Sequence, residues 1–129
     1  MLANLQPVQP HRGEIWFVRM PTYSSDKKAR PAIVVSLDGR NLNPRSKTAL
    51  VISLSTTVSE FHTHIRLEPG ETGLAEASEA QAENITVARK ESMAPARSTL
   101  RTLGAARIRQ IARCVLLAMG VLPTEVPPT

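Results

Sequence analysis

A lysine-bearing loop ends in an arginine at the point where a strand is predicted to begin. Lys27 and Lys28 precede Arg30, and Pro31 follows it directly. A guanidinium is planar and always charged, so Arg30 could donate two parallel hydrogen bonds to a phosphoryl group, and the lysines would add positive potential. An arginine beside a strand-opening proline is also common as a solvated side chain. Both interpretations of Arg30 stay open at this point.

Three consecutive hydroxyl residues follow an apolar run that ends at Leu54. Ser55, Thr56 and Thr57 are typical of turn chemistry at the end of a strand. A hydroxyl beside Arg30 across the rim of a sheet would instead hold a phosphate oxygen or orient a ribose. No Gly-x-Ser-x-Gly motif surrounds these residues, which argues against a nucleophilic serine. The arginine and the hydroxyls together are therefore a stronger candidate for an anion site than either alone.

Two histidines stand two residues apart in a run that alternates apolar and polar positions. His62 and His64 lie in a strand predicted over residues 62–67, so both would share one face. Such a pair can bind a metal ion or supply an acid and a base. No third ligand follows at a metal-binding spacing, and no Walker, dinucleotide-binding or His-Glu-x-x-His motif occurs. We therefore predict no metal and no cofactor.

The elements that must position these residues are predicted to be strands. Short apolar and β-branched runs predict strands over residues 13–18, 32–36, 49–54 and 62–67. The next segment is ambiguous, because its alanines and glutamates favour a helix, whereas the alternation along residues 78–87 also permits one long strand. Residues 38–46, which contain glycine, proline and two asparagines, are predicted to form a loop.

One amphipathic helix is predicted near the end of the chain. Apolar residues recur at helical spacing over residues 105–119, with Gly104 placed as the N-cap and Gly120 placed to end the helix. Strands followed by a single helix predict a mainly β protein, a small antiparallel β-barrel with a C-terminal α-helix packed on it. The folded domain is expected over residues 12–120, between an N-terminal arm (1–11) and a flexible tail (121–129).

Length, charge and composition narrow the class of partner. The chain has 129 residues, a net charge of +5 and only four aromatic residues. Bases dominate residues 1–50 and 84–113 and acids dominate residues 51–83, a pattern compatible with a polyanion. The single cysteine, Cys114, allows no internal disulfide, is predicted to be a packing residue, and favours a cytoplasmic location. The longest apolar run is nine residues, whereas a membrane span needs about 20, so no membrane partner is expected.

Four segments, in this order and spacing, resemble the MazF/PemK (Kid-like) toxin family. They are Arg12-Gly13-Glu14-Ile15-Trp16, the run from Lys28 to Ser36, Leu54-Ser55-Thr56-Thr57 and Glu83-Asn84-Ile85-Thr86-Val87. The resemblance implies the toxin of a type II toxin–antitoxin system with an SH3-like barrel. It also implies a homodimer that acts as a metal-independent, sequence-selective endoribonuclease on single-stranded RNA and is neutralised by a small acidic cognate antitoxin. The family favours the strand for residues 78–87.

The resemblance assigns roles residue by residue. Arg30 falls on the family's catalytic arginine and Thr56 on its catalytic threonine, while Glu83 and His64 are the candidates for the general base. Cleavage would use the substrate's own 2′-OH and leave a 2′,3′-cyclic phosphate. The residues expected to contact RNA are Lys27, Lys28, Arg19, Thr57 and Gln81.

The sequence departs from the family pattern at three places, and two other functions stay in view. His62 replaces a proline ahead of the histidine that His64 matches. Arg19 replaces an acid common in the first strand or at its exit, and Ser25-Asp26 stand where a Glu-Gln pair is often found. One alternative is a toxin of the same barrel fold that poisons gyrase and cuts nothing. The other is a catalytically degenerate member that only binds RNA or antitoxin.

Overall fold

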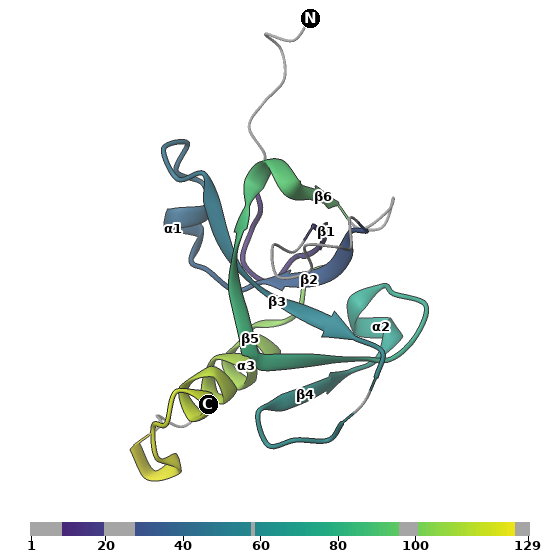
Figure 1. The fold of residues 1–129 in the computed structure, drawn as a ribbon, viewed down its shortest axis with the longest axis vertical. Helices are drawn as coiled ribbons and strands as arrows, with labels where there is room; N and C mark the ends of the chain where they lie inside the picture. Colours follow the sequence, from purple (N-terminus) through teal and green to yellow (C-terminus); the bar gives the residue numbers. More distant parts are fainter. Residues whose placement is uncertain (1–8, 20–27, 58, 96–100, 126–129) are drawn as a thin grey trace, which may run out of the picture.

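The computed structural model describes residues 9–19, 28–57, 59–95 and 101–125, and these form one antiparallel sheet with a helix against it (Figure 1). The sheet has the strand order β4-β5-β3-β2-β1-β6. In chain order the strands are β1 (Ile15–Val18), β2 (Arg30–Val34), β3 (Thr48–Ser55), β4 (His64–Leu67), β5 (Ser78–Arg89) and β6 (Met93–Pro95). The helices are α1 (Asp38–Asn41), α2 (Pro69–Thr72) and α3 (Ala105–Ala118), with short 3-10 turns η2 (Lys90–Ser92) and η3 (Pro123–Glu125).

The sheet is curved but open, which corrects the expectation of a closed barrel. Strands β4 and β6 are its two edges, and each pairs with one neighbour only among the described residues. Much of the curvature comes from β5, where the pairing with β3 jumps from Ile52 opposite Ile85 to Leu54 opposite Ala80. The residues of β5 between these two pairs bend the strand, so that its first part pairs with β4 as well (Figure 1). The predicted mainly β class with a C-terminal helix is confirmed.

Alternation along the strands creates two apolar clusters, one on each face of the sheet. The first also includes residues of α3 and consists of Ile15, Ile33, Ile52, Leu54, Leu67, Ala80, Leu103, Ile108 and Ile111. The second lies on the other face and consists of Trp16, Val18, Ala32, Val34, Ala49, Val51, Ala88 and Met93. Because successive residues of β1, β2 and β3 contribute to opposite clusters, a one-residue slip in register would exchange the two faces.

Helix α3 is built as its sequence predicts. Gly104 is the N-cap, and Gly120, just beyond the helix, has a φ of +91°, which glycine adopts without steric cost. Ile108, Ile111 and Cys114 are buried. No helix among the described residues is long and apolar enough to cross a membrane.

Two sequence predictions need correction. Strand β4 begins at His64, so His62 lies in the preceding turn and does not share a strand face with His64. Residues 38–41, predicted to be loop, form α1, where the buried Asn41 side chain donates a hydrogen bond to the carbonyl of Ser36 (2.7 Å).

Residues 78–87 are part of strand β5, which confirms the prediction of one long strand there. Ala80 and Ala82 are buried in the sheet, and their packing outweighs their helix propensity.

Candidate active site

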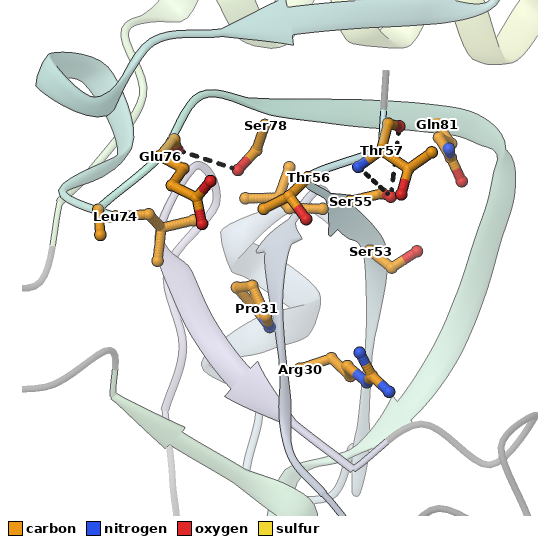
Figure 2. A pocket seen from close by; sticks show the side chains of 12 residues that line it. Arg30, Pro31, Ser53, Ser55, Thr56, Thr57, Leu74, Glu76, Ser78 and Gln81 are labelled. Carbon is orange, nitrogen blue, oxygen red and sulfur yellow. Dashed lines mark hydrogen bonds between the residues drawn. The ribbon is translucent and has the colours of Figure 1, made fainter. Parts of the chain in front are cut away.

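An open pocket of about 430 Å³ lies where β2 begins and β3 ends. Its lining includes Arg30, Ser53, Thr56, Thr57 and Gln81 (Figure 2). In this view Arg30 lies at one end of the pocket, and Thr56 and Thr57 lie at the opposite end. The pocket therefore combines one guanidinium with several hydroxyls, groups that are suited to a phosphate or a ribose.

The pairing of β2 with β3 explains why these residues meet. Ala32 lies opposite Ser53 in this antiparallel pair. Arg30 is two residues before Ala32 and Ser55 is two residues after Ser53, so both reach the same end of the sheet and the same side of the two strands. The sequence spacing within each strand, together with the register, thus brings Arg30 to the hydroxyl run.

The hydroxyl run forms a turn that presents its threonines at the rim. The Ser55 hydroxyl accepts a hydrogen bond from the Thr57 backbone N–H (3.1 Å) and donates one to the Thr57 carbonyl (3.4 Å). Ser55 is therefore engaged in holding the turn. Thr56 and Thr57 are exposed. The turn that the sequence predicts is thus part of the candidate site. Ser55 holds the turn together, and Thr56 within it lines the pocket.

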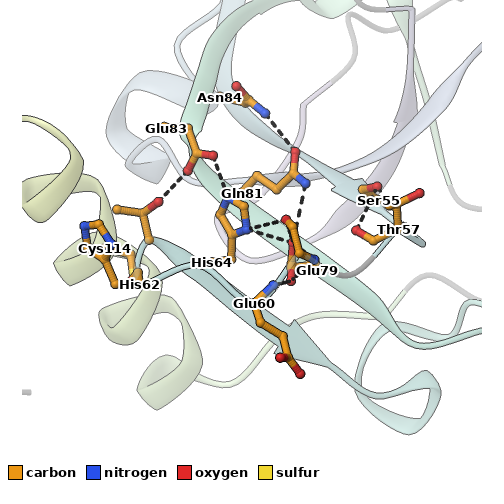
Figure 3. A network of polar contacts seen from close by, with 12 residues as sticks. Ser55, Thr57, Glu60, His62, His64, Glu79, Gln81, Glu83, Asn84 and Cys114 are labelled. Atoms are coloured by element: carbon orange, nitrogen blue, oxygen red, sulfur yellow. Dashed lines mark hydrogen bonds and ion pairs between the residues drawn. The ribbon is translucent and has the colours of Figure 1, made fainter.

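A second polar cluster lies beside the pocket, and we call it the His64 network (Figure 3). It consists of His64, Glu79, Glu83, Ser59 and Thr63. His64 contacts a carboxylate at each ring nitrogen, with Nδ1 2.8 Å from Glu79 Oε1 and Nε2 2.5 Å from Glu83 Oε2. The His64 side chain is only 7% exposed. A carboxylate is a hydrogen-bond acceptor, and one lies at each ring nitrogen of His64. These two contacts hold the ring in one orientation between β4 and β5.

Glu79 is the buried carboxylate of the His64 network and was not predicted from the sequence. It is 1% exposed and accepts hydrogen bonds from the backbone N–H groups of Ser59 and Glu60 (both 3.1 Å) and from the Ser59 hydroxyl (3.0 Å). Burial alone would raise the pKa of Glu79, but these hydrogen bonds outweigh burial and lower it. A buried carboxylate of this kind is visible only once the register places β5 against His64.

Glu83 lies at the exposed side of the same network. Its side chain is 41% exposed and accepts a hydrogen bond from the Thr63 hydroxyl (2.6 Å). Burial would raise the pKa of Glu83, but the hydrogen bonds from Thr63 and His64 lower it overall. Glu83 and His64 are thus partners of each other, and neither belongs to the lining of the pocket.

Gln81 joins the pocket to the His64 network. It lines the pocket, and its side-chain amide lies 3.5 Å from Glu79 Oε1 while its oxygen accepts a hydrogen bond from Asn84 (2.8 Å). Glu76 is a pocket-lining carboxylate that the sequence did not single out. The side chains of Lys28 and Arg19 are exposed, and Lys27 lies outside the described residues.

Cys114 and His62 take no part in the pocket. Cys114 is buried on α3, and burial raises the pKa of its thiol, which disfavours the nucleophilic thiolate. The predicted packing role of Cys114 agrees with its burial. His62 is exposed, and its ring lies against that of Phe61, with centroids 4.4 Å apart.

Several solved structures share this fold. An endoribonuclease from a mycobacterial species is 23% identical, with a TM-score of 0.66 over 89% of this chain and 94% of that one. An endoribonuclease in complex with its cognate antitoxin, also mycobacterial, is 21% identical, with a TM-score of 0.67 over 88% of this chain and 97% of that one. The Mycobacterium tuberculosis toxin MazF-mt6 is 17% identical, with a TM-score of 0.65 over 84% and 97%.

The sequence itself decides the family. No curated protein matches the chain significantly. The family described as PemK-like, MazF-like toxin of type II toxin–antitoxin systems matches residues 11–119, which include the pocket, the His64 network and α3. Since this match covers most of the chain, the protein belongs to the PemK-like, MazF-like toxin family of type II toxin–antitoxin systems.

Proposed function

We propose that the protein is a metal-independent endoribonuclease that cuts single-stranded RNA in the pocket of Arg30 and Thr56. The observation that carries this proposal is the lining of that pocket, where a guanidinium and exposed hydroxyls share one open space. The likeness in fold to endoribonucleases from mycobacteria adds support. Recognition of a particular RNA sequence would come from Gln81 in the lining of the pocket and from Lys28, two residues before Arg30.

The reaction needs no nucleophile from the protein. The substrate's 2′-oxygen attacks the adjacent phosphorus and loses its proton to a base, while the bond from phosphorus to the 5′-oxygen breaks. A 2′,3′-cyclic phosphate and a 5′-hydroxyl result. Arg30 would stabilise the charge that develops on the phosphoryl oxygens, and Thr56 would hydrogen-bond the phosphate or the ribose. Arg30 is not the base, because a guanidinium stays protonated.

Three groups in or beside the pocket could act as the base that takes up the 2′-OH proton, namely Glu76, Glu83 and His64. Glu83 and His64 already contact each other, so either would have to break that contact to accept the 2′-OH proton. Glu76 lines the pocket itself. We therefore rank Glu76 above Glu83 and His64 for this role, and assign the His64 network to positioning Gln81.

The decisive experiment incubates the purified protein with a long single-stranded RNA in the presence of EDTA. We expect cuts at defined sites and products that end in a 2′,3′-cyclic phosphate. Arg30→Ala should lower the rate at least about 100-fold, the usual loss when a group that stabilises transition-state charge is removed. Arg109→Gln removes one charge from the exposed face of α3 and serves as the control, with cleavage unchanged.

Other outcomes would reject the proposal in different ways. RNA that is retarded on a gel but stays intact would indicate a member that only binds RNA. No effect on RNA, together with inhibited DNA supercoiling, would indicate a gyrase-directed toxin. Equal cleavage by Arg30→Ala and the unmodified protein would remove Arg30 from the reaction.

We also propose that an acidic antitoxin neutralises the protein by covering this pocket. An acidic peptide laid along a basic surface can occupy the place of RNA by matching its charge. A mycobacterial endoribonuclease of the same fold has been solved with its cognate antitoxin. Competition between such a partner and RNA for the pocket tests the idea, and a partner that binds without slowing cleavage would contradict it.

A further inference from the structure

Three cations gather at the end of β3 that lies away from the pocket. Arg40 belongs to α1, Lys47 directly precedes β3, and Lys90 begins η2 after β5. The backbone N–H of Lys90 donates a hydrogen bond to the carbonyl of Lys47 (2.9 Å), and Arg40 Nη2 donates one to Thr48 Oγ1 (2.7 Å). We call Arg40, Lys47 and Lys90 the Lys90 cluster.

Lys90 is held in an environment that is unfavourable for a cation. The residue is only 7% exposed, and its ammonium donates to the carbonyl of Asn43 at 3.3 Å, a neutral and rather distant acceptor. An ammonium carries three N–H donors, so this carbonyl satisfies one of them. Burial first, and then repulsion from Lys47 and Arg40, lower the pKa of Lys90. A bound anion would offset both of these costs.

The neighbouring carboxylates are engaged elsewhere. Asp38 accepts hydrogen bonds from the Arg12 backbone (2.6 Å) and from Asn41 (3.3 Å). Glu91 forms an ion pair with Arg89, at 2.8 Å. Within the described part of the chain, no ion pair joins a carboxylate to the Lys90 cluster. The cluster therefore keeps an excess of positive charge.

We propose that the Lys90 cluster binds a backbone phosphate of the RNA substrate, several nucleotides away from the bond that is cut. This inference rests on the proposed function. Strand β3 runs from Thr48, beside the cluster, to Ser55 at the pocket, a distance of roughly 23 Å at the usual rise per residue. A single strand of RNA carries a charge at every nucleotide, so one extended molecule can reach both places. Ammonium and guanidinium groups form short, strong hydrogen bonds with phosphate oxygens.

The test measures how the affinity for RNA depends on salt. Fluorescence anisotropy follows a labelled long RNA whose 2′-O-methyl groups block cleavage, so that the unmodified protein can be used. We expect Lys47→Gln to weaken binding several-fold and to reduce the slope of log K against log salt by about 0.7, the value for one phosphate contact on a single strand. Lys90→Met, which keeps the aliphatic stem, should act in the same direction. Arg109→Gln is the control, because it removes the same single positive charge at an exposed position of α3.

A dinucleotide confined to the pocket should bind Lys47→Gln and the unmodified protein equally. A slope that changes no more in Lys47→Gln than in Arg109→Gln would overturn the inference, and normal cleavage of unmodified RNA in the same preparation would leave the proposed function intact. If the unmodified protein neither bound nor cut RNA, the inference and the proposed function would both be overturned. Inorganic phosphate could instead stabilise the protein against heat, or an acidic antitoxin could bind it, in a way that depends on Lys47. If the slope for RNA did not depend on Lys47 as well, the cluster would be assigned to that other anion and the RNA contact would be rejected.

Discussion

At the residue scale, Arg30 and Thr56 are candidate site residues because one pocket brings them together. Neither is distinctive alone, since an exposed arginine and an exposed threonine are ordinary surface residues. The antiparallel pairing of β2 and β3 places both at one pocket, which combines a guanidinium with exposed hydroxyls. In the His64 network, by contrast, the polar side chains form hydrogen bonds with groups of the fold itself.

This contrast predicts different effects for two carboxylates near the pocket. Glu76→Gln should slow cleavage and change its dependence on pH, because it removes a group that can take up the 2′-OH proton in the pocket. Glu83→Gln should leave the shape of the pH profile unchanged and lower the rate only modestly, through the position of Gln81. The measurement is the initial rate of RNA cleavage across a range of pH. If Glu83→Gln alone altered the profile, Glu83 would be the base.

A second prediction at this scale concerns stability in acid. Glu79 is buried, and its pKa is lowered below the ordinary value of 4.5. A carboxylate whose pKa is lower in the folded state stabilises the fold above pH 4.5 and loses that contribution as the pH falls through the folded-state value. We expect Glu79→Gln to lower the free energy of unfolding by about 2 kcal/mol near neutral pH, a typical cost for a hydrogen-bonded charged group.

Denaturant titrations at several pH values test this expectation. The difference in unfolding free energy between the unmodified protein and Glu79→Gln should shrink as the pH is lowered below 4.5. The matched control is Glu91→Gln, because Glu91 is 73% exposed in its ion pair with Arg89 and should contribute little at any pH. A difference that stays constant with pH would contradict the assignment.

At the scale of elements, the junction of β1 with the segment before α3 depends on one glycine. Gly13 has a φ of +94°, and its backbone bonds to Val34 (2.7 Å) and to Leu103 (2.9 Å). A Cβ atom at this position would lie 3.1 Å from the Leu103 carbonyl. Gly13 therefore admits the close approach of three segments, which gives a physical reason for glycine in the Arg12-Gly13-Glu14 motif.

Gly13→Ala should consequently destabilise the fold by about 1–3 kcal/mol, the usual cost of a side chain in a strained backbone conformation. Gly39→Ala is the matched control, since Gly39 lies within α1 and a methyl group at this position would meet no atom within 4 Å, so it should be neutral or slightly stabilising. Thermal unfolding of both variants provides the comparison. Equal melting temperatures for the two variants would show that the junction relaxes without cost.

The elements also show where sequence reasoning works and where it stops. Helix α3 and the core strands could be predicted because their apolar periodicity reports the face that each buries. Strand β6 pairs with β1 through three residues that have no periodic pattern of their own, and α2 depends on a capping box between Glu68 and Glu71. Such short elements are decided by contacts with their neighbours.

The candidate site divides in the same way. Arg30 and Thr56 could be predicted because family resemblance and strand ends agree on them. The sequence could not reveal that Glu79 is buried against His64, nor that Glu83 and His64 are partners, since both facts depend on the register of β4 with β5. The open sheet is likewise a property of how its edge strands end.

At the scale of the whole molecule, an apolar groove of about 280 Å³ lies between α3 and the sheet. Its lining includes Ile85, Val115 and Leu116, and Ile85 and Val87 on β5 are 36% and 48% exposed. Apolar side chains grouped on one surface indicate an interaction site. We expect a second copy of the chain to cover this surface, which would give the homodimer that the family resemblance implies.

Ile85→Asp tests this expectation, because dimerisation would bury its carboxylate in an apolar interface at a cost of several kcal/mol. Sedimentation analysis at micromolar concentration should find a dimer for the unmodified protein and a monomer for Ile85→Asp. Phe61→Asp is the control, since Phe61 is also exposed, at 54%, but lies in the turn before β4 and outside the groove. A monomeric unmodified protein, or a dimer that both substitutions leave intact, would show that the groove does not hold a second copy.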